Sequence, residues 1–237
     1  MAARLAALVA LTLVSYPLGL LLAYTWALPA LNALPAYLLM VERLRAGDRR
    51  GAVASVLVWA AALAIFGTLA FALWPSSPEN VVLGGRAYRD EMFAWICTGV
   101  GREGSPRLFL PQHLAHLGAF VILCLATASA LSILMGAVLM NYMAFYVASL
   151  ARAGVPGATV AFLGWQPWAL CRVAAFCVLG AVLAEPLLSR LRAYRYEGIG
   201  SARPWLLAAG AGIAADMLLK SLLAPAWGPW LRAHLCP

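Results

Sequence analysis

The stretch that decides the fold is residues 113–152, which read HLAHLGAFVILCLATASALSILMGAVLMNYMAFYVASLAR. Its forty residues carry no charged side chain before the terminal Arg152. A helix needs about 20 predominantly apolar residues to cross the hydrocarbon core of a bilayer. The stretch therefore predicts membrane-spanning helices.

The composition of the whole chain agrees with that environment. Hydrophobic residues make up 64% of the 237 residues and charged residues 11%, whereas soluble domains average roughly 45–50% and about 25%. The 17 basic residues include a single lysine, Lys220, and most of the arginines lie in short segments beside apolar runs. That distribution is typical of topology signals and of contacts with anionic lipids. We expect the lipid bilayer, other membrane subunits or a second copy of the chain as partners, and no nucleic acid.

Apolar runs alternate with polar segments along the chain. The further runs are 5–28, 30–45, 51–74, 165–188 and 205–226. They predict an all-α polytopic transmembrane bundle of six or seven helices, depending on whether the short run 30–45 crosses the membrane or lies in the interface. The expected parts are an N-terminal membrane half at 1–74, an extramembrane cap at 75–112, a C-terminal membrane half at 113–190, and a basic loop with the last helix at 191–237.

Two basic segments, 42–50 and 189–203, predict the orientation. By the positive-inside rule both lie on the cytoplasmic side, so an even number of crossings separates them. Three crossings are supplied by the runs 51–74, 113–136 and 165–188. The fourth has to be 137–152, so we expect the forty-residue stretch to break near Gly136. The cap then lies outside, and we expect the membrane to be the inner membrane of a bacterium.

The two membrane halves echo each other. NALPAY at 32–37 has the same Asn-to-Tyr spacing as NYMAFY at 141–146. Each is followed by an Ala-Gly turn and then by a G-A-x-x-x-x-L-x-W segment, at 51–59 and at 157–165. With the expected crossings, the halves form an inverted internal repeat, which is common in transporters. In a chain this rich in Ala and Leu, compositional coincidence is the alternative explanation.

Polar side chains inside apolar runs are the main candidates for a functional site. Asp216 and Lys220 stand four residues apart in the last helix, where they can pair with each other or form a polar site. Polar groups in the two Asn/Tyr segments either link helices or line a substrate path; they are Asn32, Tyr37, Asn141, Tyr142 and Tyr146. Arg172 lies about two turns into its run and Glu185 lies near the other end, and we expect both to be near-surface residues whose side chains extend to the membrane surface.

His113 and His116 open the forty-residue stretch three residues apart, on one face of the predicted helix. Together with Glu91 in the preceding loop, they could bind Zn²⁺ or another divalent metal, or serve acid–base chemistry near the membrane surface. The alternative is a pair of interfacial histidines that hydrogen-bond to the loop.

The five cysteines show no CxxC spacing. Three lie inside apolar runs, where they are expected to act as small buried hydrophobic residues. Cys97 and Cys236 fall outside those runs and could pair, which the sequence alone does not test.

Three function hypotheses follow. The first is a small transporter or permease-like subunit with a polar site inside the bundle. The second is a membrane-embedded, metal-dependent or acid–base enzyme that uses the two histidines. The third is an anchor or scaffold subunit of a larger complex. A transporter predicts a water-accessible cavity that reaches Asp216. An enzyme predicts histidines that converge with a carboxylate in a cleft, and a scaffold predicts neither.

Overall fold

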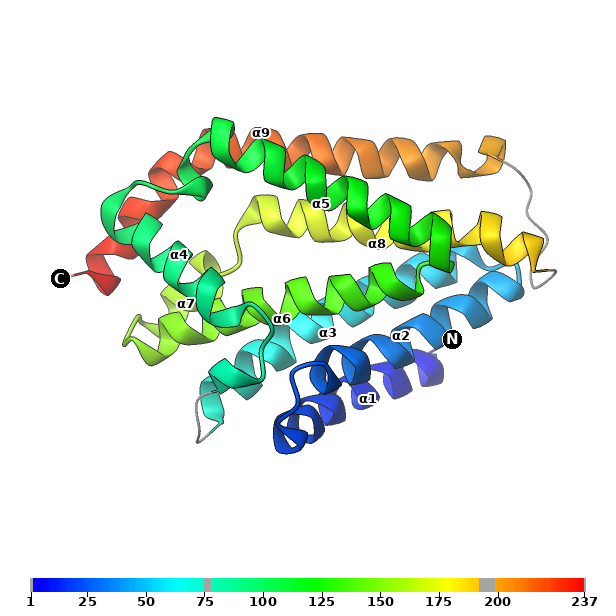
Figure 1. Cartoon of the computed structure of the whole chain (residues 1–237), viewed down its shortest axis with the longest axis horizontal. Helices are drawn as coiled ribbons and strands as arrows, with labels where there is room; N and C mark the ends of the chain where they lie inside the picture. The colour runs from blue at the N-terminus through cyan, green and yellow to red at the C-terminus, as the bar shows by residue number, and fades with distance from the viewer. Residues whose placement is uncertain (1, 75–77, 192–198, 237) are drawn as a thin grey trace.

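The computed structural model describes residues 2–74, 78–191 and 199–236. Within these ranges every regular element is helical, which confirms the predicted all-α class (Figure 1). Six helices are long and apolar enough to cross a membrane, as the apolar runs predict. They are α1 (Ala2–Leu22), α3 (Arg49–Leu73), α5 (Pro106–Thr127), α6 (Ala130–Arg152), α8 (Pro167–Arg190) and α9 (Ile199–Leu235).

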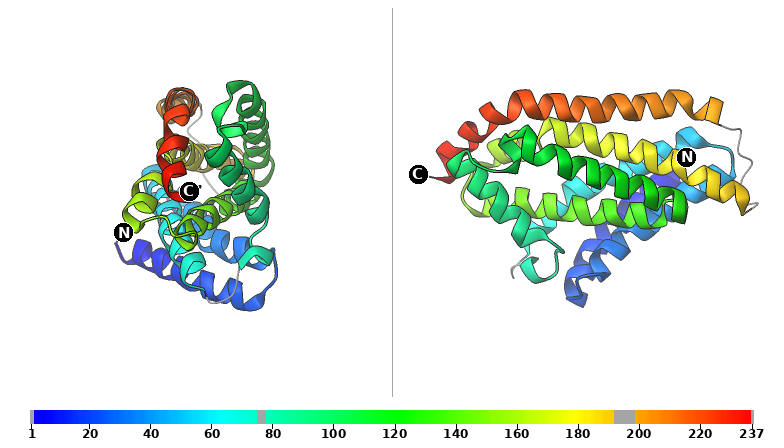
Figure 2. Two further views of the ribbon diagram at one scale, coloured as in Figure 1. Left: turned by 90° about the vertical axis from the view of Figure 1, so that its left-hand side faces the viewer. Right: turned by 45° about the horizontal axis from the view of Figure 1, so that its top comes forward.

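The long helices lie side by side along the longest axis of the molecule (Figure 1). Helix α8 packs along α9, α3 along α6, and α5 contacts both α6 and α8. The end-on view in Figure 2 shows α1 on one side of the bundle and α5 and α9 on the other. The core between them is built mainly from Ala, Leu, Val, Met and aromatic side chains.

The short apolar run forms α2 (Ala27–Arg45), which is 19 residues long and contains Pro35. It packs against α1, α3 and α6. Ala36, Met40 and Leu44 on its inner face have no exposed surface. Helix α2 is thus part of the bundle, although it is not among the six helices with the composition of a membrane span.

The forty-residue stretch does break, but seven to eight residues before the expected position. Helix α5 ends at Thr127 and α6 begins at Ala130, and Ala128 and Ser129 between them both have positive φ angles, 47° and 67°. The Ser129 hydroxyl donates a hydrogen bond of 2.6 Å to the Gly180 carbonyl of α8. This contact with another helix holds a backbone conformation that non-glycine residues seldom adopt. Gly136, where the break was expected, lies inside the continuous helix α6.

The expected cap is shorter than 75–112 because α5 already begins at Pro106, a residue type that favours the first turn of a helix. Before α5 the described elements of the cap are the short helix η1 (Pro78–Asn80), α4 (Gly85–Thr98) and η2 (Arg102–Gly104). Helix α4 packs against α6 and α9, so the cap covers one end of the bundle.

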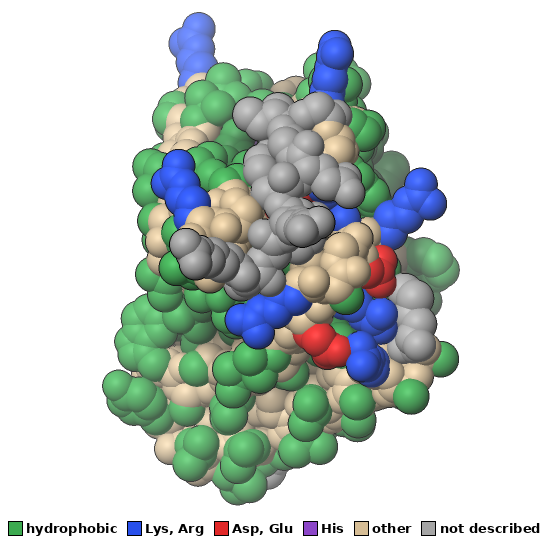
Figure 3. All heavy atoms as spheres, turned by 90° about the vertical axis from the view of Figure 1, so that its right-hand side faces the viewer, with side chains coloured by type: hydrophobic (Ala, Val, Ile, Leu, Met, Phe, Trp, Pro, Cys, Tyr) green, Lys and Arg blue, Asp and Glu red, His purple; other side chains and the backbone are tan. Residues whose placement is uncertain are grey.

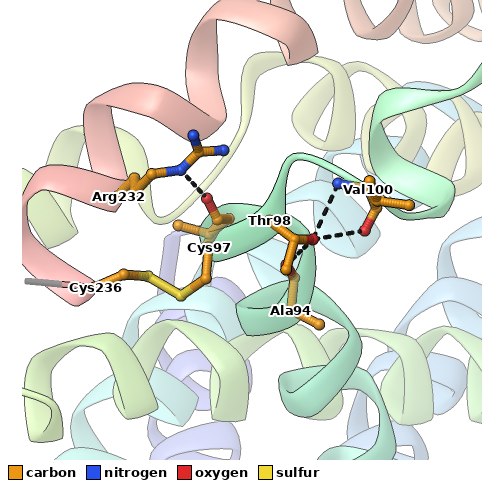
Figure 4. The surroundings of a disulfide bond; sticks show 7 residues. Ala94, Cys97, Thr98, Val100, Arg232 and Cys236 are labelled. Carbon is orange, nitrogen blue, oxygen red and sulfur yellow. Dashed lines mark hydrogen bonds between the residues drawn. A yellow bond between two sulfur atoms is a disulfide. The ribbon is translucent and has the colours of Figure 1, made fainter.

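A disulfide joins Cys97 at the end of α4 to Cys236 just after α9, across 139 positions of sequence (Figure 4). Beside it, the Arg232 Nε donates a hydrogen bond of 2.8 Å to the Ile96 carbonyl. The pairing that the sequence left open is therefore formed, and it ties the cap to the last helix. The other three cysteines are free.

The opposite end of the bundle is basic, and Figure 3 shows Lys and Arg side chains around it. The exposed arginines of the helix ends that meet there are Arg4, Arg45, Arg50, Arg190 and Arg203. Of the predicted basic segment 189–203, residues 192–198 lie outside the described residues. At this end Arg49 binds Glu185 through two contacts, Nε to Oε1 at 2.5 Å and Nη2 to Oε2 at 2.7 Å. Glu185 has no exposed surface, so its charge is matched by Arg49 of α3 rather than by solvent.

Short helix α7 (Gly157–Leu163) connects α6 to α8. It contains most of the second G-A-x-x-x-x-L-x-W segment, but Gly164 and Trp165 lie after its end. The first such segment, 51–59, is entirely inside the continuous helix α3. The two matching segments therefore differ in local structure.

Candidate functional site

Five ionisable side chains converge beneath the cap, and we call them the charged cluster. They are Glu103 of η2, His113 of α5, Arg172 of α8, and Asp216 and Lys220 of α9. Four of these residues, all but Glu103, lie in helices long and apolar enough to span the membrane. Ionisable groups at such positions are costly and commonly mark functional sites.

His113 is at the centre of the charged cluster. Its Nε2 lies 2.5 Å from Nη1 of Arg172 and 3.5 Å from Nζ of Lys220, and both of these groups are obligate donors. Its Nδ1 lies 3.5 Å from Oδ2 of Asp216, which is an acceptor. These partners assign the imidazole proton to Nδ1 and leave Nε2 as the acceptor. His113 is therefore the neutral link between two cations and a carboxylate.

Lys220 is 1% exposed and pairs with Glu103, the Nζ to Oε1 distance being 2.9 Å. Its ammonium group also lies 4.6 Å from the centre of the Phe109 ring. The ion pair of Asp216 with Lys220 that the four-residue spacing allows is not formed. Asp216 instead faces His113 and Arg172, whose Nη1 lies 3.9 Å from Oδ2.

Asp216 is 1% exposed, and its Oδ1 has no hydrogen-bond partner among the described residues. A buried polar atom without a partner typically costs about 1–3 kcal/mol. Such atoms are uncommon in folded proteins and call for an explanation such as catalysis or ligand binding.

A cavity of about 100 Å³ opens beside the charged cluster, between α3, α5, α6 and α8. One end is polar and is lined by Tyr88, Glu103, Gln112, His113, His116, Tyr142 and Arg172. The remaining wall is mostly apolar and includes Trp59, Phe120, Ile133, Leu139, Trp165 and Phe176. Phe120 and Phe176 stack with ring centres 4.5 Å apart. The cavity thus combines ionisable groups at one end with an apolar wall inside the bundle.

A second polar group lies deeper between α1, α2, α3 and α6, and we call it the neutral network: Ser15, Tyr16, Asn32, Trp59 and Asn141. The Asn141 Nδ2 donates to Asn32 Oδ1 at 2.8 Å, and the Tyr16 hydroxyl lies 3.0 Å from Asn141 Oδ1. The Asn32 Nδ2 donates to the Ser15 hydroxyl at 2.7 Å. The Trp59 indole donates to the Asn32 carbonyl at 2.8 Å.

The predicted polar residues therefore fall into separate places. Asp216 and Lys220 belong to the charged cluster, and Tyr142 lines the cavity. Asn32 and Asn141 belong to the neutral network instead. Tyr146 has no exposed surface and packs edge-on against the Tyr88 ring. Tyr37 is partly buried against the main core.

The proposed metal ligands are not brought together. His113 and His116 both line the cavity, but Glu91 pairs with Arg102 at 3.4 Å on the half-exposed face of the cap. Within the described ranges, no three or more His, Cys, Asp or Glu side chains are grouped so that they could hold a metal ion.

Sequence reasoning missed Glu103 and misplaced Arg172. Glu103 is one of several acids in the cap, and no spacing distinguishes it from the others. Arg172 falls two turns into its apolar run, which is a signal of a buried charge, but we expected it to reach the surface. The structure directs it to His113 because α5 packs against α8 at this level.

The helices and their composition define an integral membrane protein with a partly polar cavity inside an all-α bundle. No known protein family, characterised protein or solved structure matches this chain.

Proposed function

We propose that the protein is a small transporter or permease-like subunit that binds its substrate between the cavity and the charged cluster. The observation that carries the proposal is the convergence of buried ionisable groups from α5, α8 and α9 at one end of a cavity within the bundle. In membrane proteins, such groups line substrate and ion pathways or pair with one another. The cavity reaches His113 and Arg172 but not Asp216 itself, so the support for a pathway comes from these two lining residues and from the unpartnered Oδ1 of Asp216 behind them.

The echo between the two halves gives weaker support. Asn32 and Asn141, which occupy equivalent positions in the echoed segments, are hydrogen-bonded to each other. Two residues that are related by a two-fold axis can contact each other when both lie close to that axis. The inverted repeat stays a proposal for these Asn/Tyr segments, because the following G-A-x-x-x-x-L-x-W segments differ in structure.

We also propose the orientation that the basic segments predict, with the basic end in the cytoplasm of a bacterial cell and the cap outside. The disulfide between Cys97 and Cys236 supports this orientation, because disulfides persist in oxidising compartments and are rare in the cytosol.

Transport can be tested without knowing the substrate, because a transporter exposes its site to each side of the membrane in turn. The test replaces Gly136 in the cavity wall with Cys, in a background with Ala at the three free cysteines, Cys124, Cys171 and Cys177. A Cβ at Gly136 would meet only the Trp59 ring, at 3.7 Å, so the thiol fits. We expect a membrane-impermeant thiosulfonate to label it both in spheroplasts and in inside-out vesicles.

The matched control is Gly118→Cys on α5. Gly118 is exposed on a membrane-spanning helix and has no neighbour within 4 Å of an added Cβ, so its thiol should face lipid and react from neither side. Labelling of the Gly136→Cys protein from one side only would contradict transport.

An enzyme is the second candidate, and one observation favours it. His116 and Glu103 line the same cavity, and His113 is oriented by Asp216 in the way that a carboxylate orients a catalytic imidazole. One-sided labelling in the test above, from the cap side, is the result that an enzyme predicts.

A further inference from the structure

We infer that the ligand of the cavity is a small organic monoanion with an apolar tail, of the class of short-chain carboxylates. The carboxylate would bind Arg172, and the tail would lie against the apolar wall. This inference rests on the proposed function for the role of the site, but the binding itself is measured without transport.

Apart from Gln112 and Glu103, whose carboxylate pairs with Lys220, the polar end of the cavity is lined mainly by side chains that can donate hydrogen bonds. Arg172 uses only Nη1 in hydrogen bonds among the described residues, towards His113, and its side chain is 26% exposed. Its Nε and Nη2 make no hydrogen bond within the described residues, and Arg172 lines the cavity. His116 and the Tyr142 hydroxyl line the same end and make no hydrogen bond within the described part of the chain. A ligand group that only accepts hydrogen bonds, such as a carboxylate, complements this set.

The charges favour a single negative charge on the ligand. Lys220 is matched by Glu103 at 2.9 Å, and neither Lys220 nor Asp216 lines the cavity. The nearest carboxylate oxygen to Arg172 is Oδ2 of Asp216 at 3.9 Å, which is too long for a hydrogen bond. Arg172 is thus the cation of the charged cluster that lacks a carboxylate at hydrogen-bond distance. A planar guanidinium binds a carboxylate through two parallel hydrogen bonds.

The wall and the volume of the cavity set the size of the tail. Phe120, Ile133 and Phe176 offer no hydrogen bond through their side chains, so they suit a hydrocarbon group. An apolar cavity of about 150 Å³ holds benzene, and this cavity measures about 100 Å³. A ligand smaller than benzene, with roughly three to five carbons, fits that space.

Saturation-transfer difference NMR of the detergent-purified protein with butyrate tests the inference, because the method detects weak binding. We expect butyrate to bind, with its methyl protons receiving the most saturation from the apolar wall. Butyramide, which has the same shape without the charge, should bind at least tenfold more weakly. Inorganic phosphate, which has charge but no tail, should not displace butyrate. Equal binding of the amide, or displacement by phosphate, would overturn the inference.

Two variants test whether butyrate binds in the cavity. Arg172→Gln should weaken butyrate binding roughly 10- to 100-fold, the usual effect of losing a charged hydrogen bond. Arg107→Gln, an exposed arginine of the same helix as His113, is the control and should bind as the wild type does. Because Arg172→Gln also removes a partner of His113, a second variant leaves the charged cluster intact. Gly136→Leu should fill the cavity and abolish binding, whereas Gly118→Leu should have no effect.

Butyrate affinity unchanged by both Arg172→Gln and Gly136→Leu would show that the ligand binds elsewhere and would overturn the assignment. This failure is distinguishable from failure of the transport proposal. If butyrate does not bind but Gly136→Cys is labelled from both sides, the protein transports another class of substrate. If butyrate binds but labelling is one-sided, the ligand assignment stands and transport does not.

Discussion

The neutral network and the charged cluster are both buried, and both join side chains from four elements, yet they differ in how completely their hydrogen bonds are satisfied. In the neutral network both side-chain amides, of Asn32 and Asn141, have partners within 3.0 Å. In the charged cluster Asp216 keeps an oxygen without a partner, and Arg172 keeps donors open to a cavity. A satisfied network stabilises a unique packing. A polar network beside a cavity that still has unused donors and acceptors can form hydrogen bonds with a ligand.

The largest effect is expected from breaking the ion pair of Lys220 with Glu103. Lys220→Met removes the buried ammonium and leaves the carboxylate of Glu103 without its partner, which typically costs about 3–5 kcal/mol. Thermal unfolding of the detergent-solubilised protein measures the loss.

The double variant Lys220→Met/Glu103→Gln is the control for that loss. It removes both charges, so most of the stability should return. If the double variant is no more stable than Lys220→Met, the cost comes from packing of the lysine chain rather than from an unpaired charge.

A smaller effect is expected in the neutral network. Asn141→Leu leaves the Asn32 Oδ1 without its donor and should lower the free energy of unfolding by about 1–3 kcal/mol. The Tyr16 hydroxyl keeps its other acceptor, the Leu63 carbonyl at 3.1 Å. Ser149→Ala on the same helix is the control, because the Ser149 hydroxyl bonds only within its own helix, to the Phe145 carbonyl. Butyrate binding should be the same in both variants. Loss of butyrate binding in Asn141→Leu would mean that the neutral network and the charged cluster are energetically coupled rather than independent.

The membrane helices could be predicted from the sequence, but the contacts between them could not. Long uncharged runs predicted the membrane helices, because their length must match the bilayer. The sequence predicted the break near Gly136, but the structure has it at Ala128 and Ser129. Its position depends on a hydrogen bond from Ser129 to the Gly180 carbonyl, which is 51 residues away in the sequence. The neutral network and the charged cluster were combined into one predicted site for a related reason. A sequence shows that Asn141 and Asp216 are polar at membrane depth, but it does not show which helices bring partners to them.

Partner choice also explains the error at Lys220. A spacing of four residues brings Asp216 and Lys220 to one helix face, and that part of the prediction follows from helix geometry. Lys220 instead forms an ion pair with Glu103 of the cap, a residue more than 100 positions away in the sequence. Helix α9 is held against the cap partly by the disulfide of Cys97 and Cys236, so the cap helps to determine the charge pairing inside the bundle.

Asp216→Asn separates the structural and binding roles of the charged cluster. The amide keeps the shape of the side chain and can still accept from His113 Nδ1, so the change in stability should be small. The substitution also removes the negative charge that competes with a bound carboxylate for Arg172, so butyrate affinity should rise roughly tenfold. Titration by saturation-transfer difference NMR measures it, with Asp90→Asn on the exposed face of the cap as the control. An unchanged or weaker affinity would contradict the role given to Arg172.

The smallest effect is expected from an ion pair at the surface of the cap. Hydrogen bonds from Arg89 and, to a lesser extent, Arg86 lower the pKa of Glu79 below its ordinary value. Since the folded state holds the proton less tightly than the unfolded state, Glu79 adds stability above the ordinary carboxyl pKa of about 4.5, and this contribution disappears as the pH falls below it. Solvent screens such pairs, so Glu79→Gln should cost at most about 1 kcal/mol at pH 7. The difference in unfolding temperature between the variant and the wild type should shrink steadily as the pH is lowered below about 4.5. If Glu79→Gln instead costs as much at pH 7 as Lys220→Met, burial would not be what separates the charged cluster from an ordinary ion pair.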